Sequence, residues 1–261
     1  MTKVAVILPV YFADHPIIFD KAIQSILLQT EACHLFVCQD GTLTKELHQL
    51  CESYPKEKVS LLYSHENKGL PSTLNRGIRM ALKQGYEYIA RMDADDISMP
   101  NRLELQLKYL RQHPKVDLVG CQAELIDKSG NYCGIKKVNE NIIFNSLKFN
   151  CDLIHPSVMF KSTFFEDYGF YDESLLKSQD YELWLRASQK GAVIRNIQLS
   201  LISFRYEPEL ISRRKKEQWF NIKIKYKYLN KWQFLPGIAR HLFILICPTF
   251  ILKWLLIKKT N

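Results

Sequence analysis

Short apolar segments alternate with helical segments along residues 3–96, and this alternation constrains the fold more than any other feature of the sequence. Segments rich in branched and aromatic side chains, which predict strands, lie at 3–11, 35–39, 59–64 and 86–92. Segments with apolar residues at helical spacing lie between them at 17–28, 44–53 and 71–82. Short connections between such elements predict βαβ units, and therefore an α/β fold with a mostly parallel, Rossmann-like sheet and helices on both faces.

The pattern changes after residue 96. We predict a helix over about 100–111, a strand over 116–123 and a hairpin over 125–134. The elements predicted after the hairpin are a helix near 141–149, a helix beginning at Ser178 or Gln179, and strands at 192–196 and 199–206. Residues 1–96 and 97–205 are therefore interpreted as two halves of one domain, and 206–261 as a tail.

The tail carries the net charge of the protein, which is +9. From Arg205 onward lie 13 of the 36 basic residues but only 3 of the 27 acidic residues, so the preceding part is close to neutral. Basic and aromatic residues over 211–231, followed by apolar residues over 235–259, predict amphipathic helices. The longest uncharged stretch, 242–252, is far shorter than the roughly 20 residues that span a membrane.

Two interpretations of the tail remain open at this point. We expect a basic, apolar helical tail that lies in a membrane interface, because its charge favours anionic lipid and its Trp and Lys residues favour the interface. The alternative is a tail helix that packs on the protein's own body. No motif of DNA or RNA recognition accompanies the charge, so nucleic acid is not an expected partner.

The seven cysteines indicate a reducing environment. Their number is odd and no CxxC pair occurs, so neither a disulfide framework nor a zinc knuckle is predicted. The apolar stretch near Met1 is too short for a signal peptide. Together with the basic tail, these features predict a cytoplasmic protein attached peripherally to the inner face of the plasma membrane.

A dense acidic cluster follows the fourth predicted strand, in the sequence Arg91-Met-Asp-Ala-Asp-Asp96. The carboxyl end of a strand is the usual place for a ligand in an open α/β sheet. Carboxylates this close repel one another unless a cation lies between them, and Mg²⁺ or Mn²⁺ binds oxygen ligands together with phosphates. The cluster therefore predicts a metal site for a phosphorylated substrate. The alternative is a solvated acidic turn before a helix, where aspartate is favoured anyway.

Polar groups also follow the other predicted strands. Pro9-Val10-Tyr11 ends the first strand, Gln39-Asp40-Gly41 ends the second, and Asn67-Lys68-Gly69 follows the third. In a parallel sheet these groups meet the acidic cluster at one edge. Asp40 can accept a hydrogen bond from a base and Tyr11 can line a base pocket, although Asp40-Gly41 by itself is only a turn signal. Asp180 lies in the first turn of a predicted helix, where a carboxylate also favours the helix dipole.

Taken in order, these motifs resemble those of the family 2 glycosyltransferases, in particular bacterial members that build capsule, exopolysaccharide or lipooligosaccharide. The resemblance covers residues 3–205 and rests on Pro9-Val-Tyr11, Ser25-Ile-Leu-Leu-Gln-Thr30, Asp40-Gly-Thr42, Asn67-Lys-Gly69 with Asn75 and Gly77, Arg91–Asp96, Pro100-Asn-Arg102 with Gln106, and Gln179–Trp184. It implies a GT-A fold, a nucleotide-sugar donor, a divalent metal (Mn²⁺ or Mg²⁺) and inversion at the anomeric carbon. Residues 1–96 would then bind the nucleotide sugar, and 97–205 would bind the acceptor and supply the base.

The resemblance also implies roles by position. Asp40 would contact the base, most often uracil, so a UDP-sugar is the expected donor. Asp95 would be a metal ligand, and Asp93 would face the ribose or the metal-bound diphosphate, which makes it a second candidate ligand. Asp180 would deprotonate the hydroxyl of a glycan or lipid-linked acceptor. The other expected donor-site residues are Pro9, Tyr11, Asn67, Gly69, Asn75, Arg76, Arg91, Ala94 and Arg205.

The chain departs from the family pattern in two places. Gln39 stands where many relatives carry the first of two aspartates, although Asp40 keeps the second. Arg205-Tyr206-Glu207 stands where relatives often have Arg-x-His in a loop over the diphosphate. Arg205 can still pair with phosphate, whereas Glu207 is no substitute for histidine, so closure of this loop over the donor is expected to differ.

Rival readings explain less of the sequence. A haloacid-dehalogenase-like phosphatase also places Asp-Gly-Thr after a strand, but its nucleophilic aspartate would fall at position 38, which is Cys38. A non-catalytic module that binds membrane or nucleic acid through the basic tail would leave Asp93, Asp95 and Asp180 without a purpose. An inactive relative is disfavoured because both Asp95 and Asp180 are kept.

Overall fold

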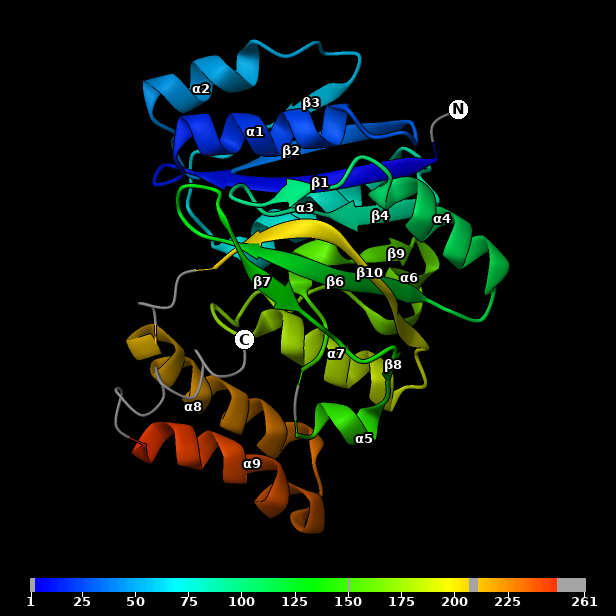
Figure 1. Ribbon diagram of the computed structural model, residues 1–261, viewed down its shortest axis with the longest axis vertical. Helices are drawn as coiled ribbons and strands as arrows, with labels where there is room; N and C mark the ends of the chain where they lie inside the picture. Colours follow the sequence, from blue (N-terminus) through cyan, green and yellow to red (C-terminus); the bar gives the residue numbers. More distant parts are fainter. Residues whose placement is uncertain (1–2, 150, 207–210, 248–261) are drawn as a thin grey trace.

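The structure, a computed structural model, describes residues 3–149, 151–206 and 211–247, and its centre is one mixed sheet (Figure 1). The strands lie in the order β3-β2-β1-β4-β9-β6-β10-β5, with β7 paired to β6 and β8 paired to β10. Their bounds are β1 Val4–Tyr11, β2 Cys33–Asp40, β3 Val59–Leu62, β4 Tyr88–Arg91, β5 Ile97–Ser98, β6 Leu118–Ile126, β7 Tyr132–Lys136, β8 Asn141–Ile142, β9 Met159–Lys161 and β10 Ile194–Arg205.

The first half of the chain forms the predicted parallel units. β1 is parallel to both β2 and β4, and β2 is parallel to β3. β9 lies between β4 and β6 and is antiparallel to both, so the sheet is mixed where the second half of the chain joins the first. Because the strands of the first half all end at the same edge, the polar groups that follow them in the sequence are brought together there.

Helices cover both faces of this sheet. Their bounds are α1 Pro16–Leu27, α2 Lys45–Glu52, α3 Leu70–Lys83, α4 Arg102–Gln112, α5 Phe144–Leu147, α6 Thr163–Tyr168 and α7 Gln179–Gln189, with a 3₁₀ turn, η1, at His155–Ser157. Side chains of β1 alternate between the two faces. Ala5 and Ile7 pack with α3 and α7, whereas Val6 and Leu8 pack with α1 and α4. This double burial explains why β1 is apolar along almost its whole length.

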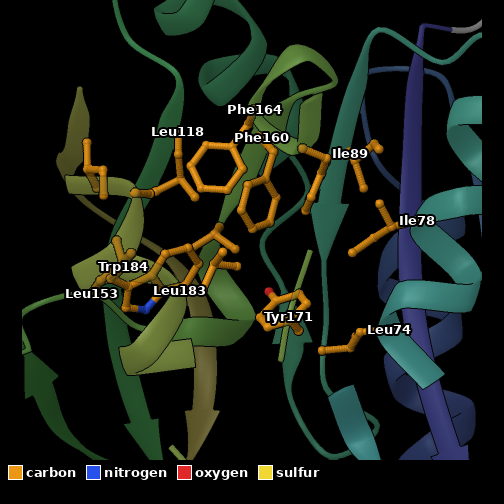
Figure 2. Close-up of a cluster of buried hydrophobic side chains, with 14 of the residues drawn as sticks. Leu74, Ile78, Ile89, Leu118, Leu153, Phe160, Phe164, Tyr171, Leu183 and Trp184 are labelled. Carbon is orange, nitrogen blue, oxygen red and sulfur yellow. The ribbon is translucent and has the colours of Figure 1, made fainter. Parts of the chain in front are cut away.

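The core beneath α7 joins the two halves of the domain (Figure 2). In that view Ile78 of α3 and Ile89 of β4 lie on one side, and Phe160 of β9 lies between them and Trp184 of α7. The rings of Phe160 and Trp184 stack with centroids 5.8 Å apart. Since α7 carries Asp180 at its first turn, this packing fixes the position of that carboxylate relative to the parallel strands.

Gly77 allows α3 to approach the sheet closely. A Cβ atom at this position would lie 2.6 Å from Cys38 Sγ and 2.7 Å from Ile7 Cγ2. We expect Gly77→Ala to lower the free energy of unfolding by about 1–3 kcal/mol, because the added methyl overpacks the interface between helix and sheet. Thermal unfolding would measure the loss, with Lys83→Ala at an exposed position of the same helix as the control. A variant as stable as the wild type would contradict this account of the packing.

Parts of the second half differ from the sequence prediction. The expected helix over 141–149 is instead the short strand β8 followed by the short helix α5. The two strands expected at 192–196 and 199–206 are one strand, β10, whose register against β6 shifts between Ile197 and Ile202. A β-bulge leaves residues unpaired without ending a strand, so the interruption in the sequence pattern was mistaken for a loop. The hairpin prediction was right: β6 and β7 are antiparallel neighbours, and Gly130 in their turn has φ +91°.

The tail begins with two helices, α8 Ile211–Tyr228 and α9 Lys231–Ile246, which form a layer at the end of the molecule away from α2 and β3 (Figure 1). α8 packs on the body: the Tyr228 hydroxyl donates to Glu182 of α7, and Lys225 Nζ donates to the carbonyl oxygens of Lys148 and Gly237. The alternative of a tail helix packed on the body is therefore right for α8. None of the helices in the described parts is long and apolar enough to cross a membrane. The predicted apolar segment beyond residue 247 lies outside the described residues.

Candidate functional site

A cleft of about 620 Å³ opens at the carboxyl edge of the parallel strands. It is bordered by the loops after β1, β2 and β4 and by the segment that enters α7. Its lining residues are Pro9, Val10, Tyr11, Asp14, Asp40, Asn67, Leu70, Asp93, Ala94, Asp95, Leu176, Lys177, Ser178, Gln179 and Asp180. The residues predicted from the sequence that line this cleft are Pro9, Tyr11, Asp40, Asn67, Asp93, Ala94, Asp95 and Asp180.

Strand register explains why these side chains meet. In the parallel ladder Tyr11 at the end of β1 lies opposite Asp40 at the end of β2. On the other side of β1, Arg91 lies opposite Ile7, so β4 ends four residues before Tyr11. The chain after β4 therefore turns across the edge of the sheet below Tyr11, and this turn carries the acidic cluster.

The acidic cluster is compact enough to hold a cation. One carboxylate oxygen from each of Asp93, Asp95 and Asp96 lies within 4.8 Å of the others. Loss of solvent around the cleft raises the pKa of Asp95 to about 6, and the negative charge of Asp93 adds to the rise. Burial raises the pKa of Asp96 well above its usual range, with further contributions from Asp93 and Asp95. Such mutual repulsion is relieved by a shared cation.

Asp96 is the buried member of the acidic cluster. Its Oδ1 accepts a hydrogen bond of 2.8 Å from the backbone N–H of Arg205, which joins the turn after β4 to the end of β10. Its Oδ2 is buried and has no hydrogen-bond partner among the described residues. A buried carboxylate oxygen without a partner is costly, and a metal ion or a metal-bound water would satisfy it.

Asp14 is a fourth carboxylate in the cleft, and the sequence analysis missed it. Its Oδ2 accepts a hydrogen bond of 2.9 Å from the backbone N–H of Tyr11. Burial raises the pKa of Asp14 to about 7, and the charges of Asp95 and Asp93 contribute to the increase. In the sequence Asp14 resembles an ordinary turn residue before a helix, and only its position just after the first strand could have signalled its place in the cleft.

The raised pKa values predict that metal binding depends on pH. The pKa of Asp95 in the folded protein, about 6, lies above the value of about 3.9 expected in the unfolded chain, so the metal-free protein loses stability as pH rises between them. A divalent cation competes with protons for these carboxylates, and its affinity rises with pH through about 6. We therefore expect Mn²⁺ to raise the melting temperature more at about pH 7.5 than at about pH 5. An equal increase at both pH values would contradict a carboxylate site.

Asp40 is held by the loop that begins α3. Its Oδ1 accepts hydrogen bonds from the backbone N–H groups of Lys68, at 2.9 Å, and Gly69, at 3.2 Å. Gly69 has φ +85°, a conformation that other residues adopt only with strain. Gly69 is therefore placed to orient Asp40 rather than to line the cleft itself.

Asn75, Arg76 and Arg205 do not line the cleft but connect the elements around it. The Asn75 side chain exchanges hydrogen bonds with the backbone of Tyr171 and donates to Glu173. The Arg76 guanidinium donates to the carbonyl oxygens of Gln39, Leu62 and Tyr63.

Arg205 donates to the carbonyl oxygens of Asp95, Asp127 and Lys128 at 2.6–3.0 Å, and so ties the acidic turn to the β6–β7 hairpin. Its guanidinium thus bonds to the protein's own backbone, and the donor contacts expected of Asn75, Arg76 and Arg205 stay predictions. Glu207, where the family pattern has histidine, lies outside the described residues.

Arg91 is the buried counter-charge of the site. Its side chain is 3% exposed and pairs with the carboxylate of Asp93. Its Nε and Nη1 have no hydrogen-bond partner among the described residues. The positive charge lowers the pKa values of Asp95, Asp96 and Asp180 against the effect of burial. Arg91 thus lies beneath the cleft and acts on its carboxylates rather than lining it.

Asp180 lies at the start of α7 and lines the same cleft as the acidic cluster. Ser178, which precedes the helix, has φ +58°. No other non-glycine residue in the described parts of the chain has a left-handed backbone conformation. Such strain is retained where the fold needs a particular direction of the chain. Burial raises the pKa of Asp180, while a backbone hydrogen bond and the charge of Arg91 oppose the rise.

The mixed sheet with an acidic turn at its carboxyl edge is the arrangement that the resemblance in the sequence predicted, and comparison with known proteins identifies the family. The model of the family named "Glycosyl transferase family 2" matches residues 5–168. The chain belongs to glycosyl transferase family 2, as the resemblance in the sequence predicted.

Curated relatives cover nearly the whole chain. An uncharacterized glycosyltransferase of Methanocaldococcus jannaschii is 30% identical, over 90% of this chain and 87% of its own length. The UDP-Gal:alpha-D-GlcNAc-diphosphoundecaprenol beta-1,3-galactosyltransferase of Escherichia coli is 29% identical, over 95% of this chain and 92% of its own length. An O-antigen biosynthesis glycosyltransferase of Escherichia coli is 32% identical, over 78% of this chain and 80% of its own length. The chain is therefore a glycosyltransferase by family.

Solved structures confirm the GT-A fold. A mannosyltransferase from Pyrobaculum calidifontis, in complex with GDP-Man and Mn²⁺, superposes with a TM-score of 0.66 over 99% of this chain and 76% of its own, at 15% identity. S. aureus TarS 1-349 in complex with UDP-GlcNAc gives 0.66 over 93% of this chain and 72% of its own, at 14% identity.

Proposed function

We propose that this protein is an inverting glycosyltransferase that moves a sugar from a UDP-sugar to a hydroxyl of a glycan or glycolipid in bacterial surface polysaccharide biosynthesis. The observation that carries the proposal is that one cleft is lined both by the acidic turn of Asp93 and Asp95 and by Asp180 at the start of α7. A leaving diphosphate needs positive charge, which a cation held by the acidic turn would supply. An attacking hydroxyl needs a base, which Asp180 would supply.

The residues of the acidic turn fit a divalent cation, Mn²⁺ or Mg²⁺. Three carboxylates converge, the pKa values of two of them are raised, and a buried Asp96 oxygen has no hydrogen-bond partner among the described residues. Asp93 and Asp95 would hold the ion, and Asp96 would support them from below. When bound, the ion supplies Lewis acidity toward the departing diphosphate. Arg91 holds Asp93 in place through their ion pair.

Asp180 is proposed as the base. A single displacement at the anomeric carbon needs one carboxylate that takes the proton of the acceptor hydroxyl as the new bond forms. Asp180 is partly buried in the lining of the cleft, and the charge of Arg91 opposes the rise of its pKa, which favours the carboxylate form that accepts a proton.

Tyr11 and Asp40 are proposed for the nucleoside. Their strand register places them opposite one another at the end of the cleft nearest β2. The exposed ring of Tyr11 offers a stacking surface, and the carboxylate of Asp40 accepts from the N–H of uracil. Asn67 on the neighbouring loop lies within reach of the same region, because its Cβ approaches Gly41 closely.

The proposed acceptor is lipid-linked, and the proposed location is the inner face of the plasma membrane. A relative that covers most of this chain is named for transfer to a sugar on diphosphoundecaprenol. The odd number of cysteines and the absence of a CxxC pair in the sequence favour a reducing compartment. A non-catalytic module that binds membrane through the tail would leave the acidic cleft without a purpose.

A nuclear magnetic resonance time course tests the reaction. The protein is incubated with a panel of α-linked UDP-sugars and Mn²⁺, with and without bacterial lipid extract as acceptor. We expect one donor to be consumed and the transferred or released sugar to have the β configuration first, because single displacement inverts the centre. An α-configured first product would contradict the proposed mechanism, and consumption of none of the donors would contradict the proposed donor class.

A further inference from the structure

The outermost helix of the tail, α9, presents a continuous apolar face to solvent. Trp232 is 91% exposed, Leu235 70%, Phe243 55% and Ile246 81%. Leu242 and Ala239 are also exposed, so the face recurs at helical spacing along the whole of α9. We call these six residues the apolar face of α9. Exposed apolar side chains gathered on one helix face mark an interaction surface rather than ordinary surface variation.

The orientation of this face is fixed by the opposite side of the helix. Gly237, Ile238 and His241 are buried against α8. A Cβ at Gly237 would lie 3.0 Å from Leu229 Cδ1, and the carbonyl of Gly237 accepts from Lys225 Nζ at 2.6 Å. His241 Nδ1 lies 2.6 Å from Gln218 Oε1 of α8. The apolar face therefore points outward because α9 already buries its other side.

Positive charge lies beside the apolar face. The rings of Tyr226 and Phe234 meet edge to face with centroids 5.6 Å apart, which places the exposed side of α8 next to α9. The exposed Lys223 lies one turn before Tyr226, and the exposed Lys231 begins α9. Lys227 lies closer to the body, where its charge lowers the pKa of Asp172. After Glu217 the sequence contains no acidic residue. The described part of this layer after Glu217 thus contributes apolar, aromatic and basic side chains and no acidic ones.

We propose that the apolar face of α9 lies in the headgroup region of an anionic lipid bilayer, with the helix parallel to the membrane plane and Lys223 and Lys231 contacting lipid phosphates. Trp and Tyr side chains favour this region, and basic residues add attraction to anionic lipid. α9 has 16 residues, about 24 Å, which is shorter than the roughly 30 Å hydrocarbon core. A second copy is a poorer occupant, because pairing this face with itself would bring the same two lysines together.

This inference rests on the proposed membrane-linked function and assigns that attachment to a particular surface. Figure 1 shows α9 as the outermost layer, with α8 between it and the sheet. Docking through α9 would therefore hold the catalytic body at a fixed height above the lipid, where a lipid-linked acceptor is presented.

Vesicle flotation of the full chain tests the proposal. We expect binding to phosphatidylglycerol-containing vesicles, with much weaker binding to phosphatidylcholine alone. The variant Trp232→Ser/Phe243→Ser should bind at least about tenfold more weakly, since it removes two large side chains from the interface. Leu28→Ser, at an exposed apolar residue at the end of α1, is the matched control and should bind like the wild type. Lys223→Gln/Lys231→Gln should weaken binding to anionic vesicles only.

Several results would overturn the proposal. If the Trp232→Ser/Phe243→Ser variant binds vesicles like the wild type, the apolar face of α9 is not the membrane contact. If in addition the variant no longer self-associates, the face pairs two copies of the chain instead. Trp232→Ser alone alters no buried contact, so it separates loss of docking from misfolding. Consumption of the donor in the absence of lipid is measured in parallel and should not change. If the wild type binds vesicles but consumes no donor, the proposed reaction is refuted and the docking proposal is not. If the wild type consumes the donor but does not bind vesicles, the docking proposal is refuted and the proposed reaction is not.

Discussion

Asp180→Asn is expected to lower the rate of sugar transfer by about 10²–10⁴-fold while donor binding stays unchanged. The amide cannot take the proton of the acceptor hydroxyl, whereas its size preserves the first turn of α7. Because Asp180 lines the cleft without belonging to the compact acidic cluster, metal and nucleotide should bind as before. Steady-state kinetics with donor and lipid acceptor would measure the rate, and calorimetry would measure donor binding.

Asp167→Asn is the matched control for this experiment. Asp167 is exposed on α6, and it does not line the cleft. We expect its transfer rate to equal that of the wild type. Wild-type activity in Asp180→Asn would assign the base to another residue, and loss of donor binding together with activity would assign Asp180 to the donor site.

The second large effect is expected for Asp95→Asn. The substitution removes the charge of a carboxylate that we propose as a metal ligand, so Mn²⁺ binding should weaken and transfer should fall by roughly 10³-fold. Charge stabilisation of the leaving diphosphate is worth several kcal/mol and depends on the ion being held in the cleft. Water-proton relaxation would report Mn²⁺ binding directly, independently of activity.

Asp167→Asn is again the control, because it changes the net charge by the same amount away from the cleft. Removal of the charge of Asp95 should also lower the pKa of Asp14 and Asp96, since Asp95 contributes to the rise of both. Undiminished Mn²⁺ binding in Asp95→Asn would mean that Asp95 is not a ligand of the metal.

The parallel half of the fold could be predicted from the sequence because its signals are local. Each strand of this half is a short apolar run, each connection is brief, and Pro16 and Pro71 lie at or near the starts of the helices they were expected to begin. Parallel register then forces the strand ends to one edge, which is why Tyr11, Asp40 and Asp95 were correctly expected to lie together.

Long-range contacts explain what the sequence did not reveal. Asn75, Arg76 and Arg205 each donate hydrogen bonds to backbone carbonyl oxygens of other elements, and these contacts could not be read from a single sequence. The bulged register of β10 depends on its partner β6. Asp14 is held by a local turn in which its backbone N–H and its carboxylate both bond to Tyr11, so its position just after the first strand was the one signal for its place in the cleft.

Calorimetric titration of the wild-type protein with nucleotide diphosphates and nucleotide sugars tests the central claim most directly. The titration is carried out with Mn²⁺, with Mg²⁺ and with a chelator. We expect a uridine nucleotide to bind in the presence of a divalent cation, and the binding to disappear with the chelator and in Asp95→Asn. Binding of none of the nucleotides under any of these conditions would contradict the account of the cleft as a metal-dependent donor site.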